Sequence, residues 1–304
     1  MKALSADCIN KTYGKVRALK DLSFEVDRGE IYGIIGPDGA GKTTLFRILT
    51  TLLLADSGSA TVEGLDVVKD YGKIRNIIGY MPGRFSLYQD LTVEENLNFF
   101  ATVFNTTVRE NYRLIEDIYK QIEPFKERRA GKLSGGMKQK LALCCALIHK
   151  PSVLFLDEPT TGVDPVSRKE FWEMLMKLKA QGITILASTP YMDEATLCDR
   201  IALIQDGEFM KVDTPDNIVA EYPDTLWAVK AGKMHRLLKD LRGCPFVKSS
   251  FSFGATYHVT IDSCGTASDL KRYLAENGHS DISVEHIRPT VEDCFMLLSK
   301  KSGQ

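Results

Sequence analysis

The sequence lacks several features that would place it in particular classes of protein. It has no apolar run of the ~18 to 20 residues that a membrane-spanning helix requires, and its first residues contain no apolar core of a signal peptide. Its seven cysteines form no Cys-x-x-Cys pair, and its five histidines show no zinc-ligand spacing. We therefore expect reduced thiols, a cytoplasmic location and no metal site built from cysteine and histidine.

The sequence also lacks an excess of charge of either sign. Lys and Arg number 39 and Asp and Glu 40, for a formal charge of -1, so there is no bulk attraction to nucleic acid or anionic lipid, and we expect no nucleic-acid partner. The 304 residues are 44% apolar and 26% charged, which is typical of a folded globular protein. The length suggests about two domains.

A glycine-rich loop follows the short apolar run Ile31–Ile35 and precedes an apolar helical segment. The loop fits the pattern G-x-x-x-x-G-K-[ST], in which backbone N–H groups and a helix N-terminus surround phosphate oxygens. Lys42 is expected to reach the β and γ phosphates, and the Thr43 hydroxyl to ligate Mg²⁺. The residues predicted to contact the nucleotide here are Gly36, Pro37, Asp38, Gly39, Ala40, Gly41, Lys42, Thr43 and Thr44.

Two acidic residues follow a second apolar run, Val153–Leu156. An all-apolar run of this length is typical of a parallel strand that is covered on both faces, and ligands of such sheets lie beyond the carboxyl ends of the strands. Asp157 is therefore expected to hold Mg²⁺, and Glu158 to orient the attacking water. Two acids after a strand are more often a solvated turn, but the phosphate loop upstream favours the catalytic interpretation.

A second phosphate-receptive segment precedes the apolar-rich stretch 141–148. It offers the Ser134 hydroxyl and the backbone of Gly135 and Gly136 at a predicted helix N-terminus. One fold holds one nucleotide at its strand ends, so a second such segment suggests a nucleotide shared with another copy or partner.

These three motifs together resemble the nucleotide-binding subunits of ATP-binding cassette (ABC) transporters, over roughly residues 1 to 220. In the family's order they are Walker A at 36–44, the signature at 133–137 and Walker B at 156–159. The resemblance implies an α/β fold of P-loop NTPase type, with a mixed sheet core, an antiparallel β subdomain and a helical subdomain. It also implies that Tyr13 stacks on adenine and that residues 161–165 carry signals between two cassettes.

Two positions depart from the family's pattern. Gly83 stands where the family has a glutamine that touches Mg²⁺ and the attacking water, and Pro190 stands where it has a histidine for the γ-phosphate. Neither residue can supply the missing hydrogen bond, and loss of one such donor costs ~10²- to 10³-fold in rate. Our hypothesis is a degenerate ATP site whose intact signature completes the site of a different cassette. The alternative is a homodimer that hydrolyses ATP slowly.

The remainder of the chain, from about residue 223 to 304, no longer matches the cassette. Its pattern predicts the order β-α-β-β-α-β and a final helix over 290–300, a small α+β domain of the split βαβ kind. Thr290 and Asp293 have the spacing of a capping box variant. The ending 288–295 resembles the tail of ATPases from type-2 ABC export systems. We interpret this domain as a packing, dimerisation or regulatory element.

The leading functional prediction is an ATP-hydrolysing subunit, at domain 1–222, that energises a membrane exporter from the inner face of the cell membrane. Its expected partners are ATP, membrane permease subunits and a second cassette. The permease should contact the segment 83–89 and the helices after Leu91. One alternative is a structural clamp that binds ATP with little turnover. Another is a soluble cassette ATPase of translation or DNA repair, which usually carries two fused cassettes or long coiled coils. The transported compound is selected by the membrane subunits.

Overall fold

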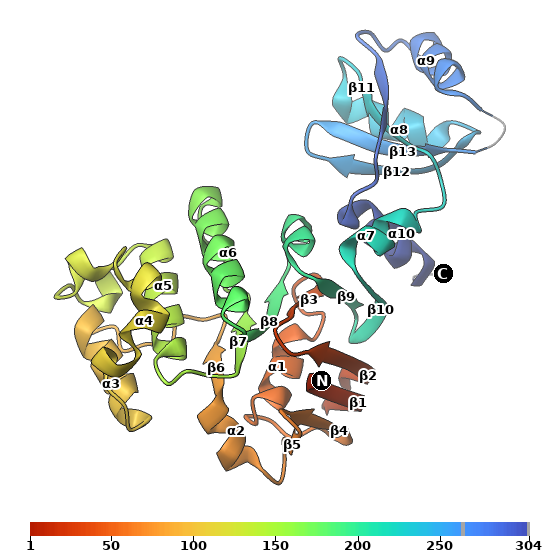
Figure 1. Ribbon diagram of the computed structural model, residues 1–304. Helices are drawn as coiled ribbons and strands as arrows, with labels where there is room; N and C mark the ends of the chain where they lie inside the picture. Colours follow the sequence, from red (N-terminus) through yellow and green to blue (C-terminus); the bar gives the residue numbers. More distant parts are fainter. Residues whose placement is uncertain (263–264, 303–304) are drawn as a thin grey trace. The chain divides into compact units, whose positions relative to one another are not determined.

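The computed structural model describes residues 1–262 and 265–302 (Figure 1). The chain divides into two compact units, Met1–Pro215 and Asp216–Gln304. The boundary predicted from the sequence, after residue 222, lies close to this division, and the functional assignment of the two domains stays a prediction.

A six-stranded mixed sheet forms the centre of the first unit, in the order β10-β9-β3-β8-β7-β6. The strands β6, β7, β8, β3 and β9 run parallel to one another. Strand β10 pairs antiparallel with β9 at the edge of the sheet. All residues of β3, β7 and β8 are buried, as expected of strands covered on both faces. The bounds are β3 Ile31–Ile35, β6 Ile78–Met81, β7 Val153–Asp157, β8 Thr184–Thr189, β9 Arg200–Gln205 and β10 Glu208–Asp213.

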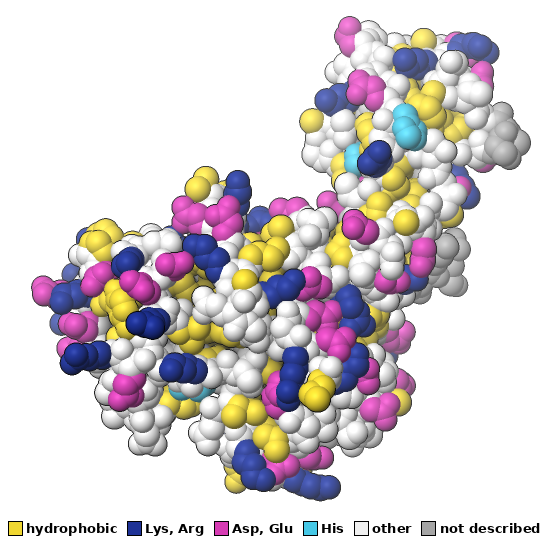
Figure 2. All heavy atoms as spheres, viewed as in Figure 1, with side chains coloured by type: hydrophobic (Ala, Val, Ile, Leu, Met, Phe, Trp, Pro, Cys, Tyr) yellow, Lys and Arg dark blue, Asp and Glu magenta, His cyan; other side chains and the backbone are white. Residues whose placement is uncertain are grey.

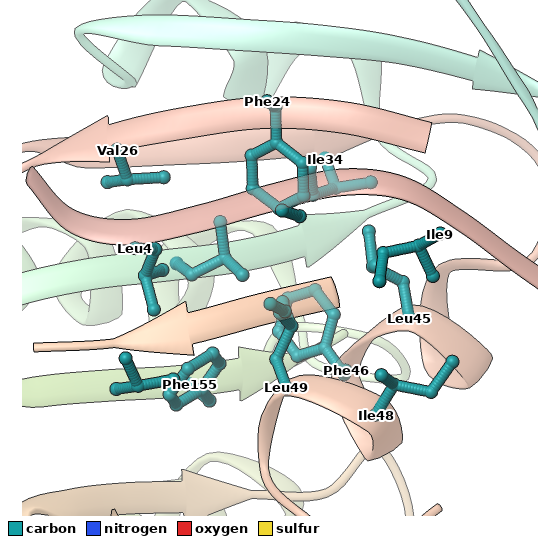
Figure 3. Close-up of a cluster of buried hydrophobic side chains, with 14 of the residues drawn as sticks. Leu4, Ile9, Phe24, Val26, Ile34, Leu45, Phe46, Ile48, Leu49 and Phe155 are labelled. Atoms are coloured by element: carbon teal, nitrogen blue, oxygen red, sulfur yellow. The ribbon is translucent and has the colours of Figure 1, made fainter. Parts of the chain in front are cut away.

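A second, antiparallel sheet has the order β2-β1-β4-β5, which confirms the expected β subdomain. Its strands are β1 Lys2–Tyr13, β2 Val16–Asp27, β4 Ser57–Val62 and β5 Leu65–Asp66. Figure 3 shows how its apolar side chains Leu4, Ile9 and Phe24 converge with those of helix α1 (Lys42–Leu49) and with Phe155 of β7. The helix that follows the phosphate loop is thereby anchored between the two sheets.

The helical part of the first unit comprises α2 Tyr71–Ile77, α3 Val93–Val103, α4 Val108–Tyr119, α5 Gly135–Leu147 and α6 Pro165–Ala180, with the short 3₁₀ helices η1 Glu123–Phe125, η2 Ala130–Lys132 and η3 Met192–Leu197. A capping box formed by Thr92 and Glu95 begins α3. A second capping box, from Thr107 and Glu110, begins α4.

The second unit has a four-stranded antiparallel sheet in the order β12-β13-β11-β14, which confirms the predicted β-α-β-β-α-β pattern. Apolar side chains of the sheet pack against Leu237 and Leu241 of α8 and Leu270 and Leu274 of α9. The elements are α7 Pro215–Ala220, β11 Leu226–Lys230, α8 Met234–Gly243, β12 Val247–Phe253, β13 Thr256–Ile261, α9 Ala267–Glu276, β14 Ser283–Ile287 and α10 Val291–Ser302.

The surface of the protein is mixed in character. Figure 2 shows basic and acidic side chains interspersed over the face in view. Across the described ranges 1–262 and 265–302, each helix is too short or too polar to cross a lipid bilayer.

Candidate functional site

The loop 36–41 connects β3 to α1, and its backbone needs glycine at two points. Gly41 has φ 106°, and a Cβ at this position would lie 2.5 Å from the carbonyl oxygen of Ala18. A Cβ on Gly36 would lie 2.1 Å from the carbonyl oxygen of Ile204. The helix begins at Lys42, because the left-handed turn at Gly41 ends the loop. The N-terminus of α1 therefore opens onto the loop.

Lys42 and Glu158, predicted as a catalytic pair, lie together. The Lys42 ammonium donates to the carbonyl oxygens of Gly36 at 2.8 Å and Pro37 at 2.9 Å, and its nitrogen is 3.0 Å from Oε1 of Glu158. The lysine is 3% exposed. Three acceptors thus surround its three N–H donors, and a phosphate oxygen can replace any one of them.

Asp157 lies at the end of β7 and is 2% exposed. Burial raises the pKa of its carboxyl group, and hydrogen bonds from Ser188 and Thr43 oppose that rise. The Ser188 hydroxyl donates to Oδ1 of Asp157 at 2.8 Å. Asp157 and Thr43, the two residues predicted to hold Mg²⁺, are therefore neighbours, and a carboxylate beside a hydroxyl is a donor set that this cation accepts.

Glu158 sits on a constrained turn directly after the strand. Its backbone φ angle is 51°, a value that residues other than glycine rarely adopt. Its backbone N–H lies 3.1 Å from the carbonyl oxygen and 3.0 Å from the hydroxyl of Ser188, which anchor the turn. The carboxylate is thereby aimed toward Lys42.

The two departures from the family's pattern occupy the surroundings of these acids. A Cβ on Gly83 would lie 3.0 Å from the carbonyl oxygen of Asp157 and 3.7 Å from Cβ of Glu158, so the chain passes close beside Walker B at this point. Pro190 directly follows Thr189, the last residue of β8. Neither brings a side-chain hydrogen-bond donor to the acids.

The signature residues lie elsewhere in the unit. Ser134 caps α5, accepting a hydrogen bond from the N–H of Met137 at 3.3 Å. A Cβ on Gly135 would approach the carbonyl oxygen of Gly162 at 3.5 Å, and one on Gly136 the hydroxyl of Ser167 at 3.0 Å. In Figure 1, β6 and β7 separate α5 from α1. The fold therefore brings Walker A and Walker B together and holds the signature apart from them.

Tyr13, the residue predicted to stack on adenine, ends β1 and is 46% exposed. The ammonium of Lys11 lies 5.9 Å from the centre of its ring. The ring is available to a ligand, and its role stays a prediction.

Sequence reasoning missed the polar residues behind the acids. Ser188 bonds both acids, and Glu194 accepts hydrogen bonds from Thr160 and Thr189 while being only 2% exposed. Ser188 could have been suspected because it lies near the end of β8, the strand that pairs with the one carrying the acids. Glu194 gave no signal, because it lies in the polar stretch 191–200, which reads as a solvated turn.

An apolar groove of about 320 Å³ lies between β6 and the helices α3 and α5. His149 lines it, with its ring stacked 3.8 Å from that of Phe104 and its Nε2 2.8 Å from the carbonyl oxygen of Ile78. Burial lowers the pKa of His149, which leaves the imidazole neutral at pH 7. Arg75, also in the lining, carries the charge at the rim, and its guanidinium is held by the hydroxyl and carbonyl of Thr51 at 2.8 and 2.9 Å.

Comparison with known proteins places this geometry in a family. Residues 19–161 match the family described as ABC transporter. The chain is 39% identical over 292 residues to "Probable multidrug ABC transporter ATP-binding protein YbhF" of Escherichia coli, covering 94% of this chain and 50% of that protein. It therefore spans about half the length of that relative. It is 36% identical to "Daunorubicin resistance ATP-binding protein DrrA2" of Streptomyces coeruleorubidus, covering 98% and 95% of the two chains.

Solved structures agree with the fold of the first unit. CbiO1 from Clostridium perfringens, described as part of the ABC transporter complex cbiONQ, has a TM-score of 0.65 and 28% identity, covering 72% of this chain and 91% of that one. The ATP-binding cassette MJ0796, a dimer bound to ADP and Pi, has a TM-score of 0.63 and 26% identity, covering 69% and 98%.

Proposed function

This chain belongs to the ABC transporter ATP-binding family, and we propose that it binds MgATP as the energy-coupling subunit of a membrane exporter. The observation that carries the proposal is the meeting of Lys42, Asp157 and Glu158 at one edge of the parallel sheet, beside the N-terminus of α1. Lys42 and the loop amides would bind the phosphates, and Asp157 and Thr43 would hold Mg²⁺, which would neutralise phosphate charge. Glu158 would orient water.

We propose further that hydrolysis at this chain's own site is slow. Gly83 and Pro190 leave Glu158 without the two additional donors that the family uses. With two donors gone from one site, ATP binds but turns over little, and a structural clamp is the limiting case.

The signature would then serve a second cassette. Its Ser134, Gly135 and Gly136 lie at the start of α5, which β6 and β7 separate from α1, so they would close over a nucleotide bound by a partner. The length of the relative YbhF supports a pair of two different cassettes. The half of YbhF that this chain does not span is long enough to contain a second cassette. A homodimer is the alternative arrangement.

The groove between β6 and the helices α3 and α5 would receive the permease. Its lining is mostly apolar, and its charged side chain is Arg75, so it suits an amphipathic helix with an acidic residue opposite Arg75. The names of relatives, among them a "Nod factor export ATP-binding protein I" that is 34% identical, support export as the direction of transport. The protein would then work at the inner face of the membrane.

The decisive experiment compares two variants in a complex of this chain reconstituted with membrane permease subunits and a candidate partner cassette. Gly135→Ala is a clean probe, because a Cβ there makes only an ordinary 3.5 Å contact within its own chain. We expect Gly135→Ala to abolish ATPase activity and transport, and Glu158→Gln to leave most of both. If Glu158→Gln abolishes both activities and Gly135→Ala does not, ATP is hydrolysed mainly at this chain's own site.

The purified chain separates an enzyme from a clamp. Calorimetry with MgATP should show binding, while phosphate release should stay low. Lys42→Ala should remove the binding, and Lys73→Ala, an exposed lysine on α2, is the matched control. Absence of binding by the wild-type chain would refute the proposed function.

A further inference from the structure

A buried carboxylate joins three segments around the candidate site. Glu194 of η3 is 2% exposed, and its Oε1 accepts a hydrogen bond from the Thr160 hydroxyl at 2.8 Å and from Nε of Arg168 at 3.0 Å. Its Oε2 accepts a bond from the Thr189 hydroxyl at 2.5 Å. Both threonines are buried as well. Each partner belongs to a different element, namely the segment after Walker B, α6 and the end of β8.

Arg168, the cation in this cluster, is itself held in place. Its NH2 group lies 3.1 and 3.0 Å from the two carboxylate oxygens of Asp193, and its guanidinium lies 4.0 Å from the centre of the Tyr191 ring. A buried carboxylate whose partners are all fixed in this way cannot move independently of them, because a lost partner would leave charge unpaired in the interior. Glu194 is therefore a rigid joint.

The joint is continuous with the phosphate loop. The backbone N–H of Gly36, the first loop residue, donates to the carbonyl oxygen of Thr189 at 3.2 Å. The Thr189 hydroxyl donates onward to Glu194, and Glu194 binds Thr160. The carbonyl oxygen of Thr160 accepts from the N–H of Val163 at 3.2 Å, inside the segment 161–165. An unbroken series of hydrogen bonds thus runs from Walker A to that segment.

We propose that Glu194 is a positioning residue that transmits occupancy of the phosphate loop to the segment 161–165. The inference rests on the proposed function, because it requires a nucleotide to bind at Lys42. Pro190 cannot take part in such a route, because it has neither an N–H nor a polar side chain. Closure of the loop on phosphate pulls on Thr189, and Glu194 passes the displacement to Thr160. The segment that faces the partner cassette then orders when ATP binds.

The test is hydrogen–deuterium exchange of the full-length chain with and without MgATP. In the wild-type protein, MgATP should slow exchange of the amides of 161–164 by at least about fivefold, the low end of measured couplings between sites. Thr160→Val removes one hydroxyl from the series at nearly constant volume. It should keep the MgATP affinity within about twofold, as for a substitution outside the binding contacts, while the slowing disappears.

One further variant and a control make the result specific. Glu194→Gln removes the charge of the buried carboxylate. Like Thr160→Val, it should keep the MgATP affinity but lose the MgATP-dependent slowing of exchange. Thr196→Val, on the same turn but exposed, removes a hydroxyl outside the series and should behave as wild type. If Thr160→Val and Glu194→Gln keep the MgATP-dependent protection, or if the wild-type chain binds MgATP without it, the inference is wrong. If the wild-type chain does not bind MgATP, the proposed function fails first and the inference falls with it.

Discussion

The ammonium of Lys42 lies 3.0 Å from Oε1 of Glu158, so the residue predicted to bind the phosphates is paired with the residue predicted to orient water. The lysine side chain is 2% exposed and the glutamate 21%, which shields the pair from solvent more than a surface ion pair. An incoming phosphate must therefore compete with the carboxylate for Lys42.

This competition predicts the effect of Glu158→Gln on binding. A neutral amide competes less for Lys42 and does not repel phosphate, so MgATP affinity should rise about fivefold, or ~1 kcal/mol. Isothermal titration calorimetry on the purified chain measures it. Glu173→Gln, an exposed carboxylate change on α6, should leave the affinity unaltered. A weaker affinity for Glu158→Gln would mean that Glu158 helps to hold the nucleotide.

Restoring a glutamine at position 83 should not restore hydrolysis. A Cβ there would lie 3.0 Å from the backbone oxygen of Asp157, which the central sheet holds in place, so the new side chain enters only by straining the chain. We expect Gly83→Gln to lower the free energy of unfolding by about 1 to 3 kcal/mol. Gly83→Ala isolates the effect of the Cβ and should account for most of that loss in chemical denaturation. A tenfold or larger gain in phosphate release, scored against the roughly 10²- to 10³-fold effect of one donor, would contradict this view.

Asp157→Asn should trade stability against metal binding. Burial raises the pKa of the Asp157 carboxyl above its ordinary value, so its ionised form at pH 7 destabilises the nucleotide-free protein. The uncharged variant should therefore unfold roughly 2 to 4 °C higher at pH 7. This difference should shrink as the pH falls through the raised pKa, where Asp157 itself becomes neutral.

The same substitution should remove the dependence of ATP affinity on Mg²⁺, because an amide is a poorer ligand for this ion. Thermal unfolding at several pH values and calorimetry with and without Mg²⁺ measure the two effects. A variant that is less stable than wild type at pH 7 would show that the hydrogen bonds from Ser188 and Thr43 outweigh the burial of charge.

Helix caps in the second unit provide a matched pair of stability predictions. Asp293 caps α10 through Thr290 and also lies 2.7 Å from Nδ1 of His258, and it is 1% exposed. Asp269 makes the same kind of capping box at α9, but its side chain is 37% exposed. Asp269→Ala removes only the exposed, reciprocal bond of the capping box and should be the milder of the two changes.

Asp293→Ala should cost about 3 kcal/mol or more, because it also strips a buried partner from His258. Urea unfolding followed by circular dichroism compares the two variants. Equal losses would show that the buried contact of Asp293 with His258 contributes nothing beyond the cap.

Motifs whose chemistry is local could be predicted from the sequence. The strand, loop and helix around Lys42 were predictable because glycine spacing and a short apolar run specify them within about a dozen residues. The capping box of Thr290 and Asp293 and the β-α-β-β-α-β order of the second unit were predictable from local residue patterns as well, and both are present. The left-handed turn at Gly41 also depends on the close approach of the loop to Ala18, which lies far from it in the sequence.

The contacts of Gly83 and Glu194 depend on segments that are far apart in the chain. The resemblance to the family implies that a glutamine is missing at position 83, but only the packed structure shows that the chain there lies close to the backbone of Asp157. Nothing local distinguishes Glu194 from the solvated acids around it, because its burial results from β8, α6 and the segment after Walker B meeting at one point. The sequence by itself determined which groups can bind a nucleotide. Tertiary structure decided which of them touch, because contacts between distant segments depend on how sheets and helices pack.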